Sequence, residues 1–268
     1  MSPATVSRAI ASLEDRVGVA LLLRTTRSVR LTDEGLHFLE QCRRGVAEIE
    51  GAFDVLRTSR AVPQGVLTVT APVVFGQRYV LPVVAELLRE YPDLQVRLVL
   101  ADRIVNVVEE GIDIAIRIAE LPNSALHMVR MGSVRRVMSA SPQYLALHGN
   151  PESMMDLRNH RVIGIEDEAG PHRGWGLDDI RRFGRPAQLS VNNVEAAISA
   201  AVAGLGIVRT LSYQIVDEIA AGQLKLLLSD TPAPSLPISL LFQGGRKDHP
   251  NIRAFINVAK RFFPAALV

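Results

Sequence analysis

Hydroxyl groups and an arginine gather on one side of segment 2–17, where their chemistry suits contact with DNA. Ser2 and Pro3 form a helix start signal, and apolar residues recur at helical spacing after it (Val6, Ala9, Ile10, Leu13 and Val17). The opposite face is small and hydroxylated around one arginine, so it fits a major groove and can bond phosphates or base edges. An ordinary amphipathic helix is the alternative. The DNA-facing candidates are Ser2, Pro3, Ala4, Thr5, Ser7 and Arg8.

A basic hairpin is expected directly after this helix. Residues 21–31 are typical of a strand, a polar turn and a return strand. Such a wing would place donors along a phosphate track beside the helix, as a winged helix-turn-helix does. A basic surface hairpin without DNA is the alternative, but a helix and a wing in succession favour DNA binding. The wing candidates are Arg24, Thr25, Thr26 and Arg27.

A long helix is predicted from Thr32, which can cap it, to about residue 60, with Asp33 and Glu34 at its positive end. Its apolar residues follow a heptad seam that one helix cannot bury alone, so the seam predicts a dimer. Cys42 on this seam is interpreted as a small buried residue rather than a redox switch. The dimerisation candidates are Leu39, Cys42, Val46, Ile49, Phe53 and Leu56.

The pattern changes after Pro63-Gln64-Gly65, and apolar runs then alternate with helical segments. Strands are expected at 66–71, 94–100 and 112–118, with helices at 75–91, broken early by Pro82, and at 104–110. This order predicts a parallel sheet covered by helices. A second unit is expected from 134, and a closing strand and helix at 238–242 and 251–262. The span therefore fits two α/β lobes between which the chain crosses twice.

A small anion is the expected ligand where the two lobes meet, because free N–H groups gather at strand ends and helix N-termini. The first such junction is Thr70, Ala71, Pro72, Val73 and Val74. The Thr70 hydroxyl and the amides of Val73 and Val74 are suited to a carboxylate.

Arg117 ends the third strand and is expected to supply positive charge to the same cleft. A structural salt bridge with Asp102 or Asp113 is an equally open interpretation of this arginine.

Composition limits the class of protein. A chain of 268 residues exceeds a typical domain of roughly 100–200 residues, and 48% hydrophobic with 22% charged residues is an ordinary globular balance. One cysteine excludes a disulfide-stapled fold. Because the sequence shows neither a secretory signal nor an apolar run of about 20 residues, we expect a cytoplasmic protein without a membrane partner.

The small net charge of +2 is unevenly distributed. Residues 1–32 hold five arginines against Glu14 and Asp15, so the basic excess lies in the DNA-facing part and the remainder is slightly acidic.

Enzyme chemistry is not expected. The sequence contains no dinucleotide or phosphate-binding glycine motif, no G-x-S-x-G elbow and no H-E-x-x-H, and its histidines lack metal-ligand spacing. We therefore predict neither a metal nor a cofactor. A solute-binding module or small enzyme built on the two lobes is the alternative function, and segment 2–60 argues against it.

The whole chain resembles LysR-type transcriptional regulators. The matching stretches are SPATVSRAIASLE (2–14), VGVALLLRTTRSVRLTDEG (17–35), GVLTVTAPVVFG (65–76), YPDLQVRL (91–98), VVEEGIDIAIR (107–117), SASPQYL (139–145), 192–194 and AGLGI (203–207). Their order and spacing make the match specific.

The resemblance implies an α/β protein: a partial winged helix-turn-helix (1–32), a long dimerising linker helix (33–60), and a two-lobed, Rossmann-like effector domain similar to periplasmic binding proteins (64–268). Lobe I would take about 64–133 and 238–268, and lobe II about 134–237. The implied partners are double-stranded promoter DNA, a small organic effector, and further copies forming a dimer and a tetramer. The resemblance also points to effector-wall positions on lobe II: Ser139, Ala140, Ile165, Asn192 and Asn193. Asn192 as a mere loop tie is the alternative.

The resemblance also implies two helices before Ser2, where this sequence has only Met1. A start assigned too late or a truncation would explain this. Baring two or three aliphatic side chains costs several kcal/mol at ~25 cal/mol per Å². We therefore expect the 268-residue polypeptide to bind DNA weakly or not at all, and the extended product to bind it.

Overall fold

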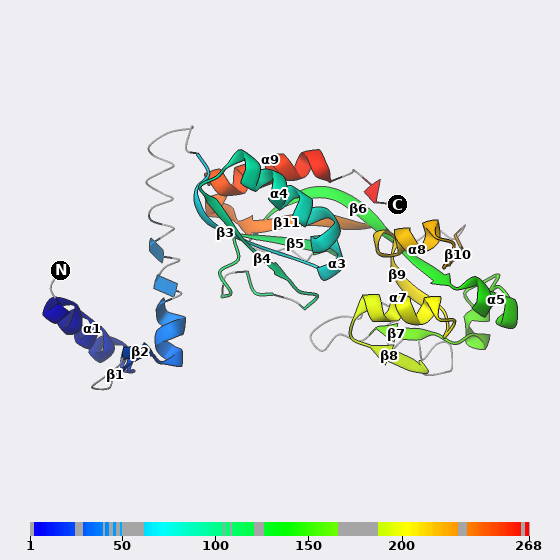
Figure 1. Cartoon of the computed structure of the whole chain (residues 1–268), viewed down its shortest axis with the longest axis horizontal. Helices are drawn as coiled ribbons and strands as arrows, with labels where there is room; N and C mark the ends of the chain where they lie inside the picture. Colours follow the sequence, from blue (N-terminus) through cyan, green and yellow to red (C-terminus); the bar gives the residue numbers. More distant parts are fainter. Residues whose placement is uncertain are drawn as a thin grey trace. The chain divides into compact units, whose positions relative to one another are not determined.

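The computed structural model describes residues 3–24, 29–39, 41–42, 45–46, 49, 62–103, 105–107, 109–120, 126–165, 187–229, 235–263 and 266–267. The chain forms two compact units, Met1–Ala61 and Val62–Val268 (Figure 1).

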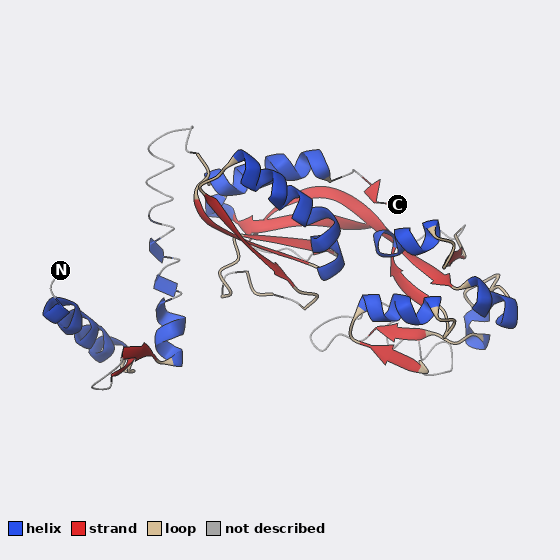
Figure 2. Ribbon diagram, in the orientation of Figure 1, coloured by secondary structure: helices blue, strands red, loops and turns tan. Residues whose placement is uncertain are grey.

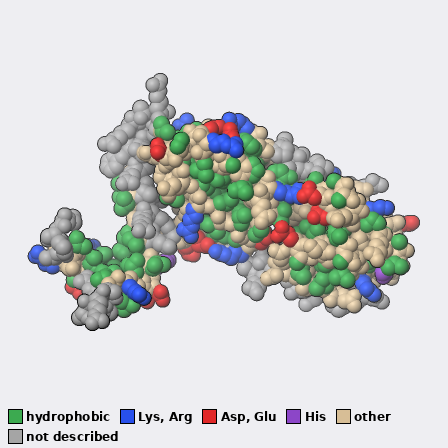
Figure 3. Space-filling model, viewed as in Figure 1, with side chains coloured by type: hydrophobic (Ala, Val, Ile, Leu, Met, Phe, Trp, Pro, Cys, Tyr) green, Lys and Arg blue, Asp and Glu red, His purple; other side chains and the backbone are tan. Residues whose placement is uncertain are grey.

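The first unit begins with the expected helix and hairpin. Helix α1 spans Pro3–Val17, and strands β1 (Leu22–Arg24) and β2 (Val29–Leu31) pair antiparallel, with Leu22 opposite Leu31. The described residues after Thr32 are helical at 33–39, 41–42, 45–46 and 49, which agrees with the predicted long helix over this part of it. Hydrophobic side chains lie at the surface of this unit (Figure 3), among them Val6 and Val17 of α1.

Lobe I of the second unit is a mixed sheet with helices on one face (Figure 2). Its parallel part has the order β4-β3-β5, from β3 (Gly65–Ala71), β4 (Leu94–Leu100) and β5 (Ile114–Ile118). Strand β11 (Ser235–Gln243) joins β5 antiparallel and also pairs with the long β6 (Leu126–Ala140). The chain closes with α9 (Pro250–Phe262) and β12 (Ala266–Leu267), which lies parallel to β6.

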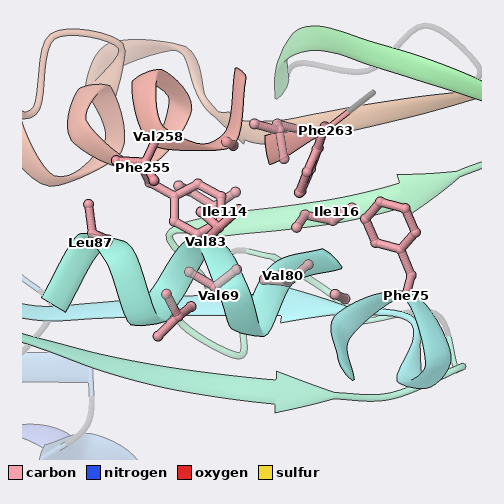
Figure 4. Close-up of a cluster of buried hydrophobic side chains, with 14 of the residues drawn as sticks. Val69, Phe75, Val80, Val83, Leu87, Ile114, Ile116, Phe255, Val258 and Phe263 are labelled. Carbon is pink, nitrogen blue, oxygen red and sulfur yellow. The ribbon is translucent and has the colours of Figure 1, made fainter. Parts of the chain in front are cut away.

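The main core lies between this sheet and helices α4 (Leu81–Glu90) and α9. Alternate strand residues such as Val69, Ile114 and Ile116 point toward Leu87 and Phe255 of the helices (Figure 4). This alternation follows from the two-residue period of a strand. The other face of the sheet carries Thr68, Thr70, Ala115 and Arg117, which leaves polar groups at the end where β3 and β5 terminate.

The helix expected to break at Pro82 continues through it. Helix α3 (Val73–Phe75), the π-helical turn η1 (Gly76–Val80) and α4 follow one another without a gap. The Leu81 N–H donates a hydrogen bond to the carbonyl of Gly76, five residues earlier in the chain. A proline conflicts with the carbonyl four residues before it, and a wider π turn relieves that conflict.

The prediction of a short helix at 104–110 is wrong. The residues that the structure describes there form turns and irregular loop. Val105 and Val107, two residues apart, are both buried against Ala115 and Leu241. Helical geometry would place them on different sides. The Glu110 carboxylate further holds the turn by accepting bonds from both terminal nitrogens of Arg103, at 2.8 and 2.6 Å.

Lobe II is built on the second half of β6. Strand β9 (Val208–Leu211) and β10 (Lys225–Leu227) pair antiparallel with it, and β7 (Ile163–Ile165) and β8 (Leu189–Val191) form a parallel pair. The helical segments are α5 (Pro142–His148), η2 (Asp156–Asn159), α7 (Val194–Val202), η3 (Ser212–Ile215) and α8 (Val216–Ala220). A last 3-10 turn, η4 (Gly244–Arg246), follows β11.

Segment η3–α8 returns the chain from lobe II to the helical side of lobe I. The Tyr213 ring meets Phe75 edge-on, with centroids 5.5 Å apart, and lies 6.0 Å from Tyr79. Arg78 of η1 forms an ion pair with Asp217 of α8. These lobe II residues therefore contact Phe75 of α3 and the π turn of lobe I.

A buried histidine lies in lobe II beside Tyr144. The Tyr144 hydroxyl accepts the Arg161 N–H at 2.8 Å and lies 3.3 Å from His160 Nδ1. Burial lowers the pKa of His160, the nearby charge of His148 lowers it further, and Asp156 acts in the opposite sense. The folded protein therefore favours neutral His160.

We predict that acid destabilises lobe II through His160. Because its pKa is lower in the folded state, the unfolded chain binds more protons, and stability falls as pH drops through about 6.5, the unfolded value. Chemical denaturation at pH 7.5 and 5.5 measures this loss, which should be smaller in His160→Gln than in wild type or in the control His127→Gln. An equal loss in all three proteins would refute this role for His160.

Candidate functional site

The DNA-facing candidates lie on α1 and at the hairpin of the first unit. Thr5, Ser7 and Arg8 are exposed on α1, where small side chains leave the backbone accessible to a groove. Pro3 and Ala4 also belong to α1, and Arg24 ends β1. Ser2, Thr25, Thr26 and Arg27 lie outside the described residues. The structure thus places one arginine and two hydroxyls of the predicted set on one exposed helix.

Glu14 joins α1 to the hairpin, a role that sequence reasoning missed. Its Oε1 accepts the backbone N–H groups of Leu21 and Leu22, at 2.7 and 2.9 Å. Gly18, with a φ of 76°, ends α1 between them and lets the chain reverse. The sequence shows Glu14 only as a negative charge. It does not reveal which backbone N–H groups lie near this carboxylate in the folded chain.

Thr32 and Gly35 fix the following helix against the same hairpin. The Thr32 N–H donates to the Leu21 carbonyl (3.0 Å), and its hydroxyl donates to the Ala20 carbonyl and accepts the Gly35 N–H, both at 2.8 Å. The predicted helix cap is confirmed. A Cβ at Gly35 would lie 2.0 Å from the Leu21 carbonyl oxygen, so the close approach requires glycine.

In the single chain, no other part of the protein fully buries the described residues of the predicted dimerisation seam. Cys42, Val46 and Ile49 are exposed and Leu39 is half-buried. Phe53 and Leu56 lie outside the described residues. The burial expected for Cys42 is therefore not found in one chain, and it would need a second copy. The seam itself stays a prediction.

The junction after β3 keeps its polar groups bonded within the chain. Thr70 is fully buried, and its hydroxyl donates to the Val99 carbonyl at 2.9 Å. The Val73 N–H donates to Asp102 Oδ1 at 3.3 Å. Ala71 and Pro72 are buried, and Val74 enters the main core. These residues do meet at the carboxyl end of β3, but two of the donors expected to hold a carboxylate are already in use.

Arg117 lies at the same end of the sheet, on β5. The register of β3 and β5 places it two residues beyond Ala115, which is opposite Thr70. Both terminal nitrogens of its guanidinium are buried. Asp113, one of the two carboxylates considered as its structural partner, is held by Arg246 and by the Thr68 N–H at 2.7 Å.

The positions proposed as the lobe II wall differ in what they offer a ligand. Ser139 and Ala140 are fully buried near the end of β6, and Ile165 is buried at the end of β7. Asn193 caps α7 by accepting the Ala196 N–H at 2.9 Å, whereas Asn192 is exposed. Asn193 is thus engaged in the helix cap, and Asn192 is accessible.

Two further buried hydroxyls, on Thr210 of β9 and Ser239 of β11, were not among the sequence candidates. Like the Ser139 hydroxyl, they are buried without a hydrogen-bond partner among the residues that the structure describes. Buried polar groups are almost always bonded, so a hydroxyl of this kind marks a place where a ligand or water would complete it. No signal in the sequence marks these hydroxyls, because their burial depends on how distant strands pair.

The part of the chain that the structure describes contains no helix long and apolar enough to cross a bilayer. In that same part, no group of three or more His, Cys, Asp or Glu side chains is arranged to hold a metal ion.

Two family models match the chain. The model for the LysR substrate binding domain covers residues 60–264, and the model for the bacterial regulatory helix-turn-helix protein, lysR family, covers residues 1–36. One match falls on each compact unit, and the substrate-binding model covers most of the second.

Similar proteins are bacterial regulators. The chain is 30% identical over 262 residues to the HTH-type transcriptional regulator CrgA of Neisseria meningitidis serogroup B, a match that covers 96% of this chain and 87% of the relative. It is also 30% identical over 259 residues to an HTH-type transcriptional regulator of Xanthomonas campestris pv. campestris, over 94% of this chain and 75% of the relative. The solved structure of CrgA, a LysR-type transcriptional regulator from Neisseria meningitidis, matches with a TM-score of 0.66 and 29% identity, over 98% of this chain and 91% of that one.

Proposed function

Because the chain belongs to the LysR family of DNA-binding transcriptional regulators, we propose that a small anionic organic effector, bound between the two lobes of Val62–Val268, changes its binding to promoter DNA. The match of both units to LysR family models carries this proposal. The relatives are transcriptional regulators rather than enzymes, which favours this function over a solute-binding module or small enzyme. We place its action in the cytoplasm, where promoter DNA lies.

The first unit supports the DNA-binding half of the proposal. Helix α1 presents Thr5, Ser7 and Arg8 at its surface, and Glu14 and Thr32 hold the hairpin and the next helix to it. A helix with small hydroxylated residues enters a major groove, while a basic wing follows the phosphates beside it.

The second unit supports the effector half. Thr70, Arg117 and the lobe II segment around Asn192 all lie at strand ends or helix starts, the usual place for ligands in α/β lobes. Arg117 gives the lobe I side positive charge, which favours an anionic ligand. The contacts of Tyr213 and Asp217 with the π turn provide a route by which movement between the lobes would alter lobe I.

We further propose that copies assemble through the heptad seam into a dimer, and two dimers into a tetramer. The exposed apolar residues Val46 and Ile49 support this assembly, because such a stripe is normally covered by a partner helix.

Replacing Arg8 by alanine tests the DNA interface. In a protein that carries two further LysR-family helices ahead of Ser2, Arg8→Ala should weaken binding to the gene's own upstream DNA. The slope of log K against log salt should fall by about 1, because one phosphate contact is lost. Fluorescence anisotropy over a range of salt concentrations measures both quantities, with the exposed Arg89→Gln of α4 as a control that should match wild type. Unchanged affinity and slope in Arg8→Ala would count against this face as the DNA-binding surface.

A further inference from the structure

We propose that Arg117 and Ser239 form a carboxylate-binding subsite at the carboxyl end of the lobe I sheet, with Arg130 beside them. This assignment rests on the proposed effector-binding function and names the group of the effector that lobe I would hold. It differs from the expected site at Thr70 and Val73, whose donors are bonded to Val99 and Asp102.

The strand register brings the three residues together. Ser239 of β11 lies directly opposite Arg117 of β5 on one side and Arg130 of β6 on the other. Directly opposed residues on antiparallel strands have Cβ atoms about 5 Å apart and face the same side of the sheet. Ser239 is therefore flanked in the sheet by two arginines, of which Arg130 is exposed.

This side of the sheet is the one away from the main core. Ser239 stands between Ile238 and Leu240, and Arg117 stands between Ile116 and Ile118, all of which pack into that core. Alternation along a strand then turns Ser239 and Arg117 to the opposite face, the face of Thr70. The subsite thus adjoins the end of β3 where the effector cleft is proposed.

The Ser239 hydroxyl is the observation that calls for a ligand. Ser239 is only 1% exposed, and its Oγ has no hydrogen-bond partner among the described residues. Leaving a hydroxyl buried and unbonded is unfavourable unless another group completes it. A bound carboxylate would accept a hydrogen bond from this hydroxyl.

A β-bulge at this point is a second, independent observation. Between Ile238 and Ser239 the pairing of β11 shifts from Gly132 to Arg130, which leaves Met131 as an extra residue in β6. Bulges re-aim side chains and are over-represented beside active sites. Here the bulge coincides with the one serine that lies between two arginines on this ladder.

The chemistry selects an organic carboxylate. A guanidinium offers parallel N–H donors that match the two oxygens of a carboxylate, and the serine adds a single donor from the side.

Thermal-shift titration of the full chain tests the subsite. The probes are acetate, succinate and benzoate at millimolar concentration, with their neutral amides at matched ionic strength. We expect at least one carboxylate to raise the melting temperature of wild type, and its amide to fail. In Ser239→Ala the apparent Kd should be about tenfold weaker, the loss typical of a hydrogen bond to a charged group.

The variants separate binding from folding. Without ligand, Ser239→Ala should melt at the wild-type temperature or above, because alanine removes a buried unbonded hydroxyl. Arg117→Gln should lose the carboxylate response. The controls Ser235→Ala, on the same strand, and Arg97→Gln, on the same sheet face at the edge strand, should respond as wild type.

Two outcomes would overturn the assignment. If Ser239→Ala and Arg117→Gln respond as wild type, carboxylates bind elsewhere, and the effector cleft of the proposed function survives without this subsite. If wild type responds to none of the carboxylates, or equally to their amides, the ligand class is wrong. The DNA-binding half of the proposed function is judged separately by the salt dependence of Arg8→Ala.

Discussion

Replacing Gly35 by alanine is expected to separate the hairpin from the helix that follows it and to weaken promoter binding by at least about tenfold, or roughly 1.4 kcal/mol. The new Cβ would lie 2.0 Å from the Leu21 carbonyl oxygen and 3.0 Å from the Thr32 hydroxyl. Both atoms belong to the hydrogen bonds that fix this corner. Backbone must therefore move, at a cost of about 1–3 kcal/mol, as in overpacked cores.

Gly45→Ala provides the matched control, because a Cβ there meets nothing within 4 Å. Gly45 is helical, so alanine should leave the protein unchanged or stabilise it by up to about 1 kcal/mol. Hydrogen exchange of segment 21–35 in the 268-residue chain should be faster in Gly35→Ala only. DNA affinity is compared in the protein that carries two further LysR-family helices ahead of Ser2. Wild-type exchange and affinity in Gly35→Ala would show that the corner does not need glycine.

Replacing Phe75 by alanine should lower the free energy of unfolding of the second unit by about 3–5 kcal/mol. Phe75 is completely buried, and its ring centroid lies 5.1 Å from Tyr79, 5.5 Å from Tyr213 and 5.4 Å from Phe263 (Figure 4 shows Phe75 and Phe263). The pairs with Tyr213 and Phe263 are edge-on, a favoured aromatic geometry. The substitution leaves a cavity where the π turn meets η3.

Phe262→Ala is the control for Phe75→Ala. Phe262 ends α9 and is 41% exposed, so its truncation should cost less than about 1 kcal/mol. Urea denaturation followed by circular dichroism measures both variants. Similar midpoints for the two would mean that the aromatic cluster adds little to stability.

Regular patterns predicted most of the fold. The apolar spacing in 2–17, the paired apolar runs in 21–31 and the strands at 66–71 and 94–100 correspond to α1, the β1–β2 hairpin, β3 and β4. These elements bury one face or both, so their period appears directly in the residue order. The two local errors lie at Pro82 and at 104–110, where a π turn and a buried loop override local preference.

Candidate site residues were predictable where their position follows from an element's end. Thr70 does end up beside Val73 at the end of β3, and Arg117 lies at the same edge. Their bonding was not predictable, because the acceptors Val99 and Asp102 come from another part of the chain. Glu14 was missed for the same reason.

The residue order alone determined that this protein joins a hydroxylated helix and a basic hairpin to a two-lobed α/β unit, because amphipathic period, caps and turns are local properties. Only the tertiary structure decided which polar groups are hydrogen-bonded within the chain and which distant residues lie side by side. Ser239 lies 122 residues from Arg117 in the sequence and beside it in the sheet. Strand order and one bulge set that proximity, and pairing between distant strands leaves no trace in the spacing of either.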